Sequence, residues 1–204
     1  MSHHKVTKPR IIGLTGGIAT GKTTVTTYLA QRYQLPILDA DVYAREAIAP
    51  PSAILTQIFT RYGAGIQNAD GSLNRQALGD IVFNDPDEKL WLETQIHPYV
   101  RQRFREALAT IQETQATVIC AIPLLFEAQL TDFVTEIWVV ACTPEQQLAR
   151  LQQRNQLSIA QAQARIASQM PLAEKIQRAD VVLDNSLDLA TLHHQVDRAL
   201  KRGC

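Results

Sequence analysis

The stretch Gly16-Gly17-Ile18-Ala19-Thr20-Gly21-Lys22-Thr23 decides the fold of this chain. It matches the pattern G-x-x-x-x-G-K-[ST], and it lies between the strand-like run IIGLT and the helical run TTVTTYLAQRY, as that pattern requires. Glycines let such a turn present consecutive backbone N–H groups to phosphate oxygens, and the following helix adds the positive end of its dipole. The sequence therefore predicts a nucleotide triphosphate site.

Each residue of this loop has an expected role. Lys22 would reach the β- and γ-phosphates, the Thr23 hydroxyl would ligate Mg²⁺, and Thr24 would hydrogen-bond the phosphates. A Rossmann dinucleotide site is excluded, because the turn has no G-x-G-x-x-G spacing. The expected cofactor is ATP with Mg²⁺, and the ATP-binding residues of the loop are Gly17, Ile18, Ala19, Thr20, Gly21, Lys22, Thr23 and Thr24.

Short apolar runs alternate with longer amphipathic stretches along the chain, which indicates an α/β fold. The near-continuous apolar content of the runs is typical of parallel strands that are buried on both faces. We predict a five-stranded parallel sheet, with strands at residues 10–15, 36–39, 117–122, 136–141 and 180–183.

Two helical segments interrupt this pattern. Residues 42–115 have helical periodicity with a break at 63–72, and we expect them to form a substrate-binding insertion at the carboxyl edge of the sheet. Residues 144–154 and 159–170 form a helical pair, joined by 155–158, that resembles a movable lid. We expect one domain, with a core of 10–41, 117–143 and 179–204, an insertion of about 42–115 and a lid of about 144–178. The glutamine-rich tract 146–169 is interpreted as a solvated helix face.

Composition limits the partners. The 204 residues include 20 basic and 20 acidic side chains, so the chain has no overall field to hold nucleic acid or an anionic membrane. No apolar run approaches the roughly 20 residues that span a bilayer. The three cysteines show no C-x-x-C spacing and the first residues are polar, which favours a reducing cytoplasm. We expect a small-molecule substrate and a monomer or weak homo-oligomer.

Two carboxylates, Asp39 and Asp41, stand at the end of the second predicted strand. That end points into the same crevice as the phosphate loop. Asp41 could accept the proton of an attacking hydroxyl and orient it toward the γ-phosphate. The alternative is that either aspartate only caps the helix that follows.

Basic residues of the lid are the next candidates. Arg150 and Arg154 stand four residues apart, so they share one helix face and could neutralise charge that develops on the triphosphate. Arg165 lies on the partner helix. His97, before Pro98, could be a ligand or base, but a histidine at a helix start more often satisfies a local hydrogen bond.

Taken together, the motifs resemble those of the dephospho-coenzyme A kinase family. They are GLTGGIATGKTTV at 13–25, ILDADVYAR at 37–45, ADGSLNRQALGDIVF at 69–83, IHP at 96–98, IPLLFE at 122–127 and VVLDNS at 181–186. The resemblance covers residues 10–200 and implies a fold of the P-loop nucleoside-monophosphate-kinase type. It also implies transfer of the ATP γ-phosphate to the ribose 3′-hydroxyl of dephospho-coenzyme A.

Carried over by position, the resemblance implies site residues. The base falls on Asp41 and the lid arginines on Arg150 and Arg154, with Lys22 also catalytic, while adenine contacts fall near Asn185. The substrate side would include Arg45, Arg75, His97, Leu124, Leu125 and Glu127.

The loop departs from the family's usual GIGSGKST at Ala19, where glycine is common. Alanine in a left-handed backbone conformation would cost about 1 kcal/mol, and we expect Ala19 to be right-handed.

Three alternatives stay open at this point. The chain could be a P-loop kinase for another small acceptor, such as a nucleotide, gluconate or shikimate. A nucleotide-dependent switch is disfavoured, because neither N-K-x-D nor D-x-x-G occurs. A catalytically silent binding protein is disfavoured because Lys22, Thr23 and Asp41 are all present.

Overall fold

The computed structural model describes residues 9–112 and 116–202. The described residues divide into two compact units, one of residues 9–39, 108–112 and 116–202 and the other of residues 40–107. Each unit is described by itself. The predicted subdivision into core, insertion and lid stays a prediction.

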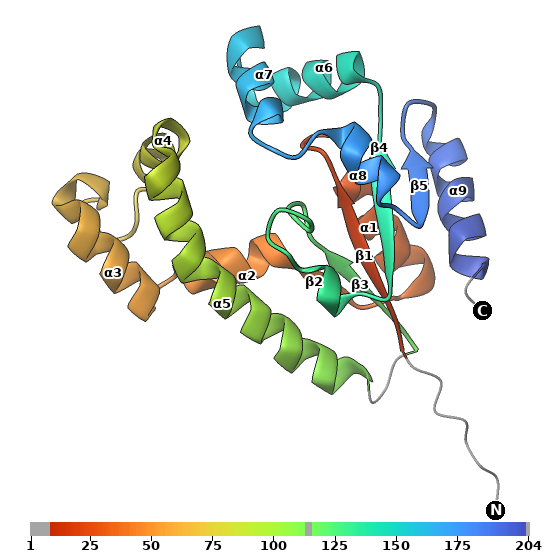
Figure 1. The fold of residues 1–204 in the computed structure, drawn as a ribbon, viewed down its shortest axis with the longest axis horizontal. Helices are drawn as coiled ribbons and strands as arrows, with labels where there is room; N and C mark the ends of the chain where they lie inside the picture. The colour runs from red at the N-terminus through yellow and green to blue at the C-terminus, as the bar shows by residue number, and fades with distance from the viewer. Residues whose placement is uncertain (1–8, 113–115, 203–204) are drawn as a thin grey trace, which may run out of the picture. The chain divides into compact units, whose positions relative to one another are not determined.

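The first unit contains a parallel sheet of five strands, which confirms the predicted fold class (Figure 1). The strand order is β2-β3-β1-β4-β5, and every neighbouring pair is parallel. The strands are β1 (Arg10–Gly16), β2 (Ile37–Asp39), β3 (Thr117–Ala121), β4 (Glu136–Ala141) and β5 (Val181–Asp184).

Burial on both faces holds only for the middle of the sheet. In β1, β3 and β4 nearly every residue is buried, as predicted. The expectation was wrong for the edge strand β5, where Val182 is 41% exposed and only Leu183 is buried. An edge strand has one neighbour and is not covered to the same degree, so its apolar content alone overstated its burial.

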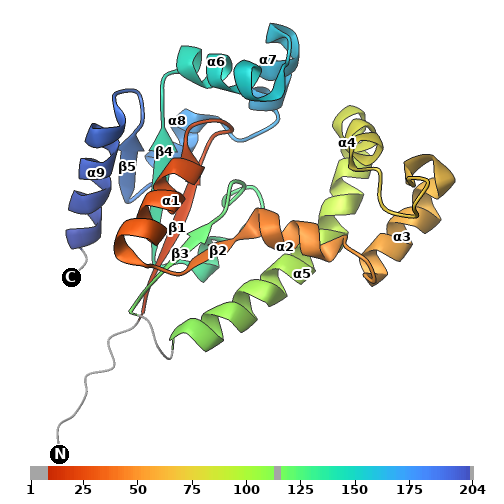
Figure 2. The same cartoon turned by 180° about the vertical axis from the view of Figure 1, so that it is seen from behind.

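Helices α1 (Lys22–Tyr33) and α9 (Leu189–Lys201) lie against one face of this sheet (Figure 2). Val25 and Leu29 of α1 and Leu192 and Val196 of α9 join inward-facing strand residues in one core cluster. The apolar residues recur at helical spacing along each helix, so one face of each is buried. This packing fixes the start of α1, and with it the phosphate loop.

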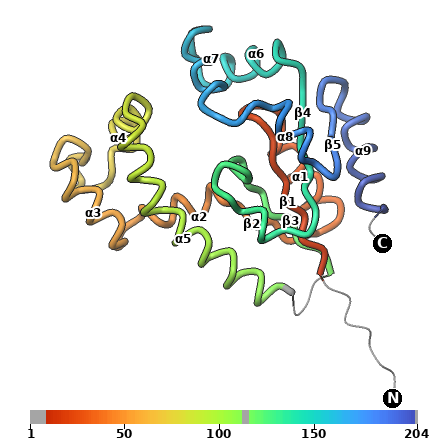
Figure 3. Tube along the Cα trace, in the orientation of Figure 1, coloured from red at the N-terminus to blue at the C-terminus, as the bar shows by residue number. Residues whose placement is uncertain are grey.

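The segment between β4 and β5 forms α6 (Pro144–Asn155), α7 (Ile159–Ala167) and α8 (Leu172–Gln177), which the chain trace connects in turn (Figure 3). Thr143 and Ser158 each form a capping box with a glutamine, which explains where α6 and α7 begin. The predicted second lid helix ran to residue 170, but α7 ends at Ala167. Pro171 follows closely, and the residue before a proline disfavours helical geometry.

The second unit is helical and has a core of its own. Ile58, Ile66 and Leu78 are among its buried residues. The break predicted at 63–72 contains a 3₁₀ turn, Gly63–Ile66, and an isolated bridge between Gln67 and Leu73. Its helices are α2 (Ala40–Ala47), α3 (Ala53–Tyr62), α4 (Arg75–Asn84) and the part of α5 (Pro86–Gln112) up to residue 107. The last predicted insertion residues, 113–115, lie outside the described residues.

An ion pair joins α3 and α5 in this unit. The Arg61 guanidinium donates two hydrogen bonds to the Glu88 carboxylate, at 2.7 and 2.8 Å, and the Tyr62 hydroxyl donates a third. Because the bonds from Arg61 and Tyr62 favour the charged carboxylate, they lower the pKa of Glu88 to about 2. Across residues 9–112 and 116–202, no helix combines the length and apolar character needed to cross a membrane.

Candidate active site

The phosphate loop joins β1, which ends at Gly16, to α1, which begins at Lys22. Gly21 occupies the N-cap position with φ 106°, a conformation that favours glycine. A Cβ atom on Gly21 would lie 2.1 Å from Nδ2 of Asn185, so no other residue fits there without displacing that side chain. Glycine has no side chain to cap the helix, and the first N–H groups of α1 are therefore available to an anion.

Ala19 is left-handed, with φ 61°. The expectation of a right-handed backbone at this position was wrong. The loop must reverse direction between a strand and a helix within a few residues, and one turn of that path falls on Ala19. The conformation costs an alanine about 1–2 kcal/mol, which other contacts of the loop must offset.

Side chains hold the carbonyl groups of the loop. Oγ1 of Thr20 donates to the Gly17 carbonyl oxygen at 2.9 Å, and Nε2 of Gln147 donates to that of Ile18 at 2.8 Å. Nδ2 of Asn185 donates to the Thr20 carbonyl oxygen at 2.8 Å. Carbonyls that are satisfied in this way are not free to turn toward an anionic ligand, which leaves such a ligand to the N–H groups of the loop that have no protein acceptor.

Asn185 and Arg150 are brought together at the loop. Nη2 of Arg150 donates to the Asn185 carbonyl oxygen at 3.0 Å. Nη1 of Arg150 is buried and has no hydrogen-bond partner among the described residues. A buried donor without a partner costs free energy unless a ligand supplies an acceptor. Its charge and position therefore suit an anionic ligand.

The two predicted lid arginines differ. Arg154, one turn after Arg150 in α6, is exposed and donates from Nε to Oδ1 of Asn155 at 2.9 Å. Arg165 is also exposed, in the last turn of α7. Arg150 also adjoins Cys142, whose pKa is raised mainly by burial, an effect that the guanidinium opposes. Of these three arginines, Arg150 is the one that donates a hydrogen bond to Asn185, which in turn holds the loop.

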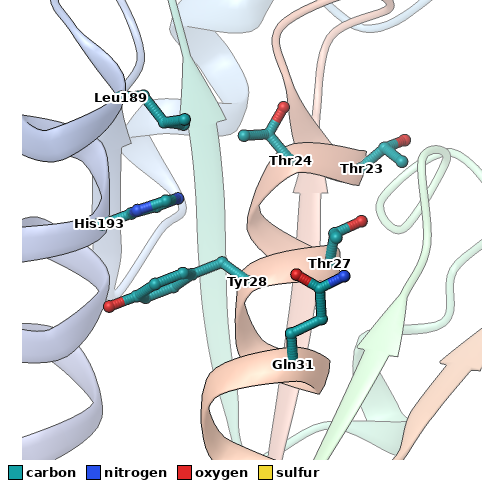
Figure 4. A pocket seen from close by; sticks show the side chains of 7 residues that line it. All are labelled: Thr23, Thr24, Thr27, Tyr28, Gln31, Leu189 and His193. Atoms are coloured by element: carbon teal, nitrogen blue, oxygen red, sulfur yellow. The ribbon is translucent and has the colours of Figure 1, made fainter.

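A groove of about 340 Å³ runs between α1 and α9 (Figure 4). The rings of Tyr28 and His193 stack in it, with centroids 3.7 Å apart and planes 9° from parallel. The Tyr28 hydroxyl donates to Asp197 at 2.8 Å, which fixes the ring. The lining residues are Thr23, Thr24, Thr27, Tyr28, Gln31, Leu189 and His193.

The predicted turn after β3 serves the protein interior in part. Leu125 is fully buried, close to Gly13 of β1, so its side chain belongs to the core. Oε1 of Glu127 forms an ion pair with the buried Lys175 at 2.8 Å and accepts the Met170 N–H at 3.0 Å. Nζ of Lys175 also donates to the Pro123 carbonyl oxygen at 3.0 Å. Glu127 thus holds the start of α8, a role that sequence reasoning missed.

The remaining predicted residues lie at the end of β2 and in the second unit. Asp39 ends β2, and Asp41 falls in the first turn of α2, inside the helix and not at its N-cap. Arg45 is in the last turn of α2, and Arg75 is the first residue of α4. His97 was expected at a helix start, which is wrong. It lies inside α5, because this long helix continues through Pro98.

Two glutamines of the site were missed as well. The tract 146–169 was interpreted as a solvated helix face, yet Gln147 is only 5% exposed. Its bond to Ile18 is matched by Gln169, whose Oε1 accepts the Ile18 N–H at 2.9 Å. The interpretation fails for these two residues because their amides bond the phosphate loop, although Gln153 and Gln163 are exposed as expected.

Comparison with known proteins identifies the family. The family model described as "Dephospho-CoA kinase" matches residues 10–191. The chain belongs to the dephospho-CoA kinase family. A curated dephospho-CoA kinase from Synechocystis sp. is 62% identical over 95% of this chain and 97% of its own.

Two solved structures resemble this chain, and one of them is a dephospho-CoA kinase. The structure of TT1252 from Thermus thermophilus has a TM-score of 0.80 at 34% identity and covers 96% of this chain and 98% of its own. A dephospho-CoA kinase from Campylobacter jejuni has a TM-score of 0.70 at 27% identity and covers 94% and 96%. The resemblance drawn from the motifs is confirmed, and the chain is a P-loop kinase that uses ATP and transfers phosphate to a hydroxyl group. The family assignment favours this kinase activity over a nucleotide-dependent switch.

Proposed function

We propose that this chain phosphorylates the ribose 3′-hydroxyl of dephospho-coenzyme A with ATP, which gives coenzyme A and ADP in the last step of coenzyme A synthesis. The observation that carries the proposal is that the phosphate loop and the guanidinium group of Arg150 are held together through Asn185. The carbonyls of the loop are held by side chains, and Arg150 keeps a buried guanidinium nitrogen without a partner among the described residues.

The loop residues fit a nucleotide triphosphate. Gly21 leaves the space that a Cβ atom would fill, and the uncapped start of α1 offers N–H donors to phosphate oxygens. Lys22 adds a positive charge at the first residue of α1. Mg²⁺, when bound with the nucleotide, supplies further positive charge, and the exposed Thr23 hydroxyl is the group that would ligate it.

The remaining roles concern the acceptor. Asp41 accepts the proton of the 3′-hydroxyl while the hydroxyl oxygen forms a bond to the γ-phosphorus of ATP. The bond between the γ-phosphorus and the bridging oxygen breaks, and ADP leaves. Arg150 neutralises charge that develops on the phosphoryl oxygens, and Arg154 assists from the exposed side of α6. Adenine lies near Asn185. The residues that contact dephospho-coenzyme A are Arg45, Arg75, His97, Leu124 and Glu127. Glu127 does so through Oε2, which has no hydrogen-bond partner among the described residues.

The setting of the enzyme is proposed on composition. The balance of 20 basic and 20 acidic residues favours a small substrate over nucleic acid or an anionic membrane. The cytoplasmic location is proposed from the three cysteines, which show no C-x-x-C spacing. We also propose a monomer or weak homo-oligomer.

The test of the function is phosphoryl transfer by the purified protein with ATP and Mg²⁺. Dephospho-coenzyme A is compared with AMP, adenosine, shikimate and gluconate, and the new phosphate is located by mass and phosphorus spectroscopy. We expect transfer only to dephospho-coenzyme A, at the 3′ position. Transfer to another acceptor, or to another hydroxyl, would overturn the proposal.

The test of the base is Asp41→Asn. It should lower kcat by about 10²–10⁴-fold and leave ATP binding unchanged, because a general base contributes on that scale. Asp39→Asn is the matched variant, since it changes the other carboxylate in the same way. A larger loss of kcat in Asp39→Asn than in Asp41→Asn would move the base to Asp39.

A further inference from the structure

The peptide groups on both sides of Ile18 are held by side chains that are distant in sequence. The Ile18 carbonyl oxygen accepts from Nε2 of Gln147 at 2.8 Å, and the Ile18 N–H donates to Oε1 of Gln169 at 2.9 Å. Gln147 belongs to α6, and Gln169 follows the end of α7. One residue of the phosphate loop is therefore bonded to both ends of the predicted lid.

The two amides have opposite tasks. Gln147 acts as a donor, and Gln169 acts as an acceptor. A carboxamide can do either, and a carboxylate can only accept. We propose that Gln147 and Gln169 are positioning residues that set the phosphate loop for the triphosphate and tie it to the lid segment, an inference that rests on the proposed ATP site.

Each glutamine is itself held in place. Gln147 is 5% exposed, and its Nε2 lies where a Cβ atom on Gly17 would come within 2.6 Å, so the missing side chain of Gly17 admits the amide. Beside Gln169, the Met170 N–H donates to Glu127, which is paired with the buried Lys175. The two hydrogen bonds therefore link the phosphate loop to a buried residue of α6 and to a segment next to the Glu127–Lys175 ion pair.

The geometry of the loop explains why the tie matters. Rotation of the peptide groups around Ile18 would redirect the N–H of Ala19, the residue with a left-handed backbone. Hydrogen bonds on both sides of Ile18 oppose that rotation.

Methionine at either position removes the hydrogen bond and keeps a similar volume. We expect Gln147→Met and Gln169→Met each to weaken equilibrium binding of ATP, measured without acceptor, by about fivefold to tenfold, which is the effect of one lost hydrogen bond. The KM for the acceptor should change by less than about twofold, because the change concerns the phosphate loop. Gln163→Met, on the exposed side of α7, is the matched control and should bind ATP as the wild type does.

Two further variants separate positioning from a purely structural role. Gln169→Glu keeps a hydrogen-bond acceptor and should bind ATP better than Gln169→Met at high salt, where the added charge is screened. Gln147→Glu should bind ATP more weakly than Gln147→Met, because a carboxylate cannot donate the hydrogen bond to the Ile18 carbonyl. The double variant Gln147→Met/Gln169→Met should lose little more affinity than the weaker-binding single variant, because both bonds hold one residue.

The proposal would be overturned by wild-type ATP affinity in both methionine variants with a lowered melting temperature. Fully additive losses in the double variant would also overturn it. If Gln147→Met does not fold, the comparison of Gln169→Met with Gln169→Glu decides by itself. Because ATP binding is measured without acceptor, failure of the proposed acceptor chemistry stays distinguishable from failure of this inference.

Discussion

The left-handed backbone of Ala19 predicts that glycine at this position stabilises the folded protein. An L-residue pays about 1–2 kcal/mol in this region, whereas glycine pays almost nothing. Glycine also gives the unfolded chain more freedom, which costs about 0.4–1 kcal/mol. The first effect is larger, so Ala19→Gly should raise the free energy of unfolding by roughly 0.5–1 kcal/mol, the difference between these two terms.

The assay is equilibrium unfolding in urea, with an unchanged dependence on denaturant required of every variant. Ala149→Gly is the matched control, because Ala149 is exposed in the interior of α6, where glycine should cost about 1 kcal/mol. The same chemical change is thus expected to have opposite signs at the two positions.

A destabilised Ala19→Gly variant, with a loss as large as that of Ala149→Gly, would refute the reasoning. Ala19 would then not be left-handed in solution. The two glutamine bonds to Ile18 would then have no backbone strain at Ala19 to offset. At about 1 kcal/mol each, they are strong enough to offset the strain of a left-handed Ala19.

Three other outcomes are expected. Lys175→Met should cost about 3 kcal/mol in urea unfolding, because it leaves the Glu127 charge without its buried partner, and adding Glu127→Gln should recover much of that loss. The lowered pKa of Glu88 means that its contribution to stability is complete above about pH 4.5 and is lost as pH falls toward about 2. Glu88→Gln should therefore be less stable than wild type above pH 4.5, and the difference should shrink as pH falls toward 2, which flattens the acid dependence of stability. Arg150→Met should lower kcat by about 10²–10³-fold and Arg154→Met by far less; equal losses would show that anchoring does not matter.

The fold could be predicted from the sequence where local pattern and long-range packing agree. The central strands and α1 occur almost at the predicted residues, because their apolar periodicity is also what the core requires. The prediction was less accurate where burial or helix length depends on contacts with elements that are distant in the sequence. The exposure of Val182 depends on the edge position of β5, and the continuation of α5 through Pro98 opposes a strong local rule.

The candidate site could be predicted in its residue types and less in its contacts. The loop was found through its motif, and Arg150 through its place on the lid helix. The spacing of four residues placed Arg154 on the same face, but spacing does not show that Arg150 bonds the Asn185 carbonyl and Arg154 only a neighbouring side chain. Nor does it show the backbone of Ala19, which is set by the whole path of the loop.

Gln147 could have been recognised from the sequence, and Gln169 could not. Gln147 stands four residues before the buried Leu151, so helical periodicity places it on the inward face of α6, where a polar side chain needs a partner. Composition hid this, since a tract rich in glutamine is usually interpreted as solvated. Gln169 follows the last turn of α7, where no periodicity applies, and its partner is 151 positions away in sequence. A bond of this kind depends on how β1 and the returning chain come together, so only the folded structure reveals it.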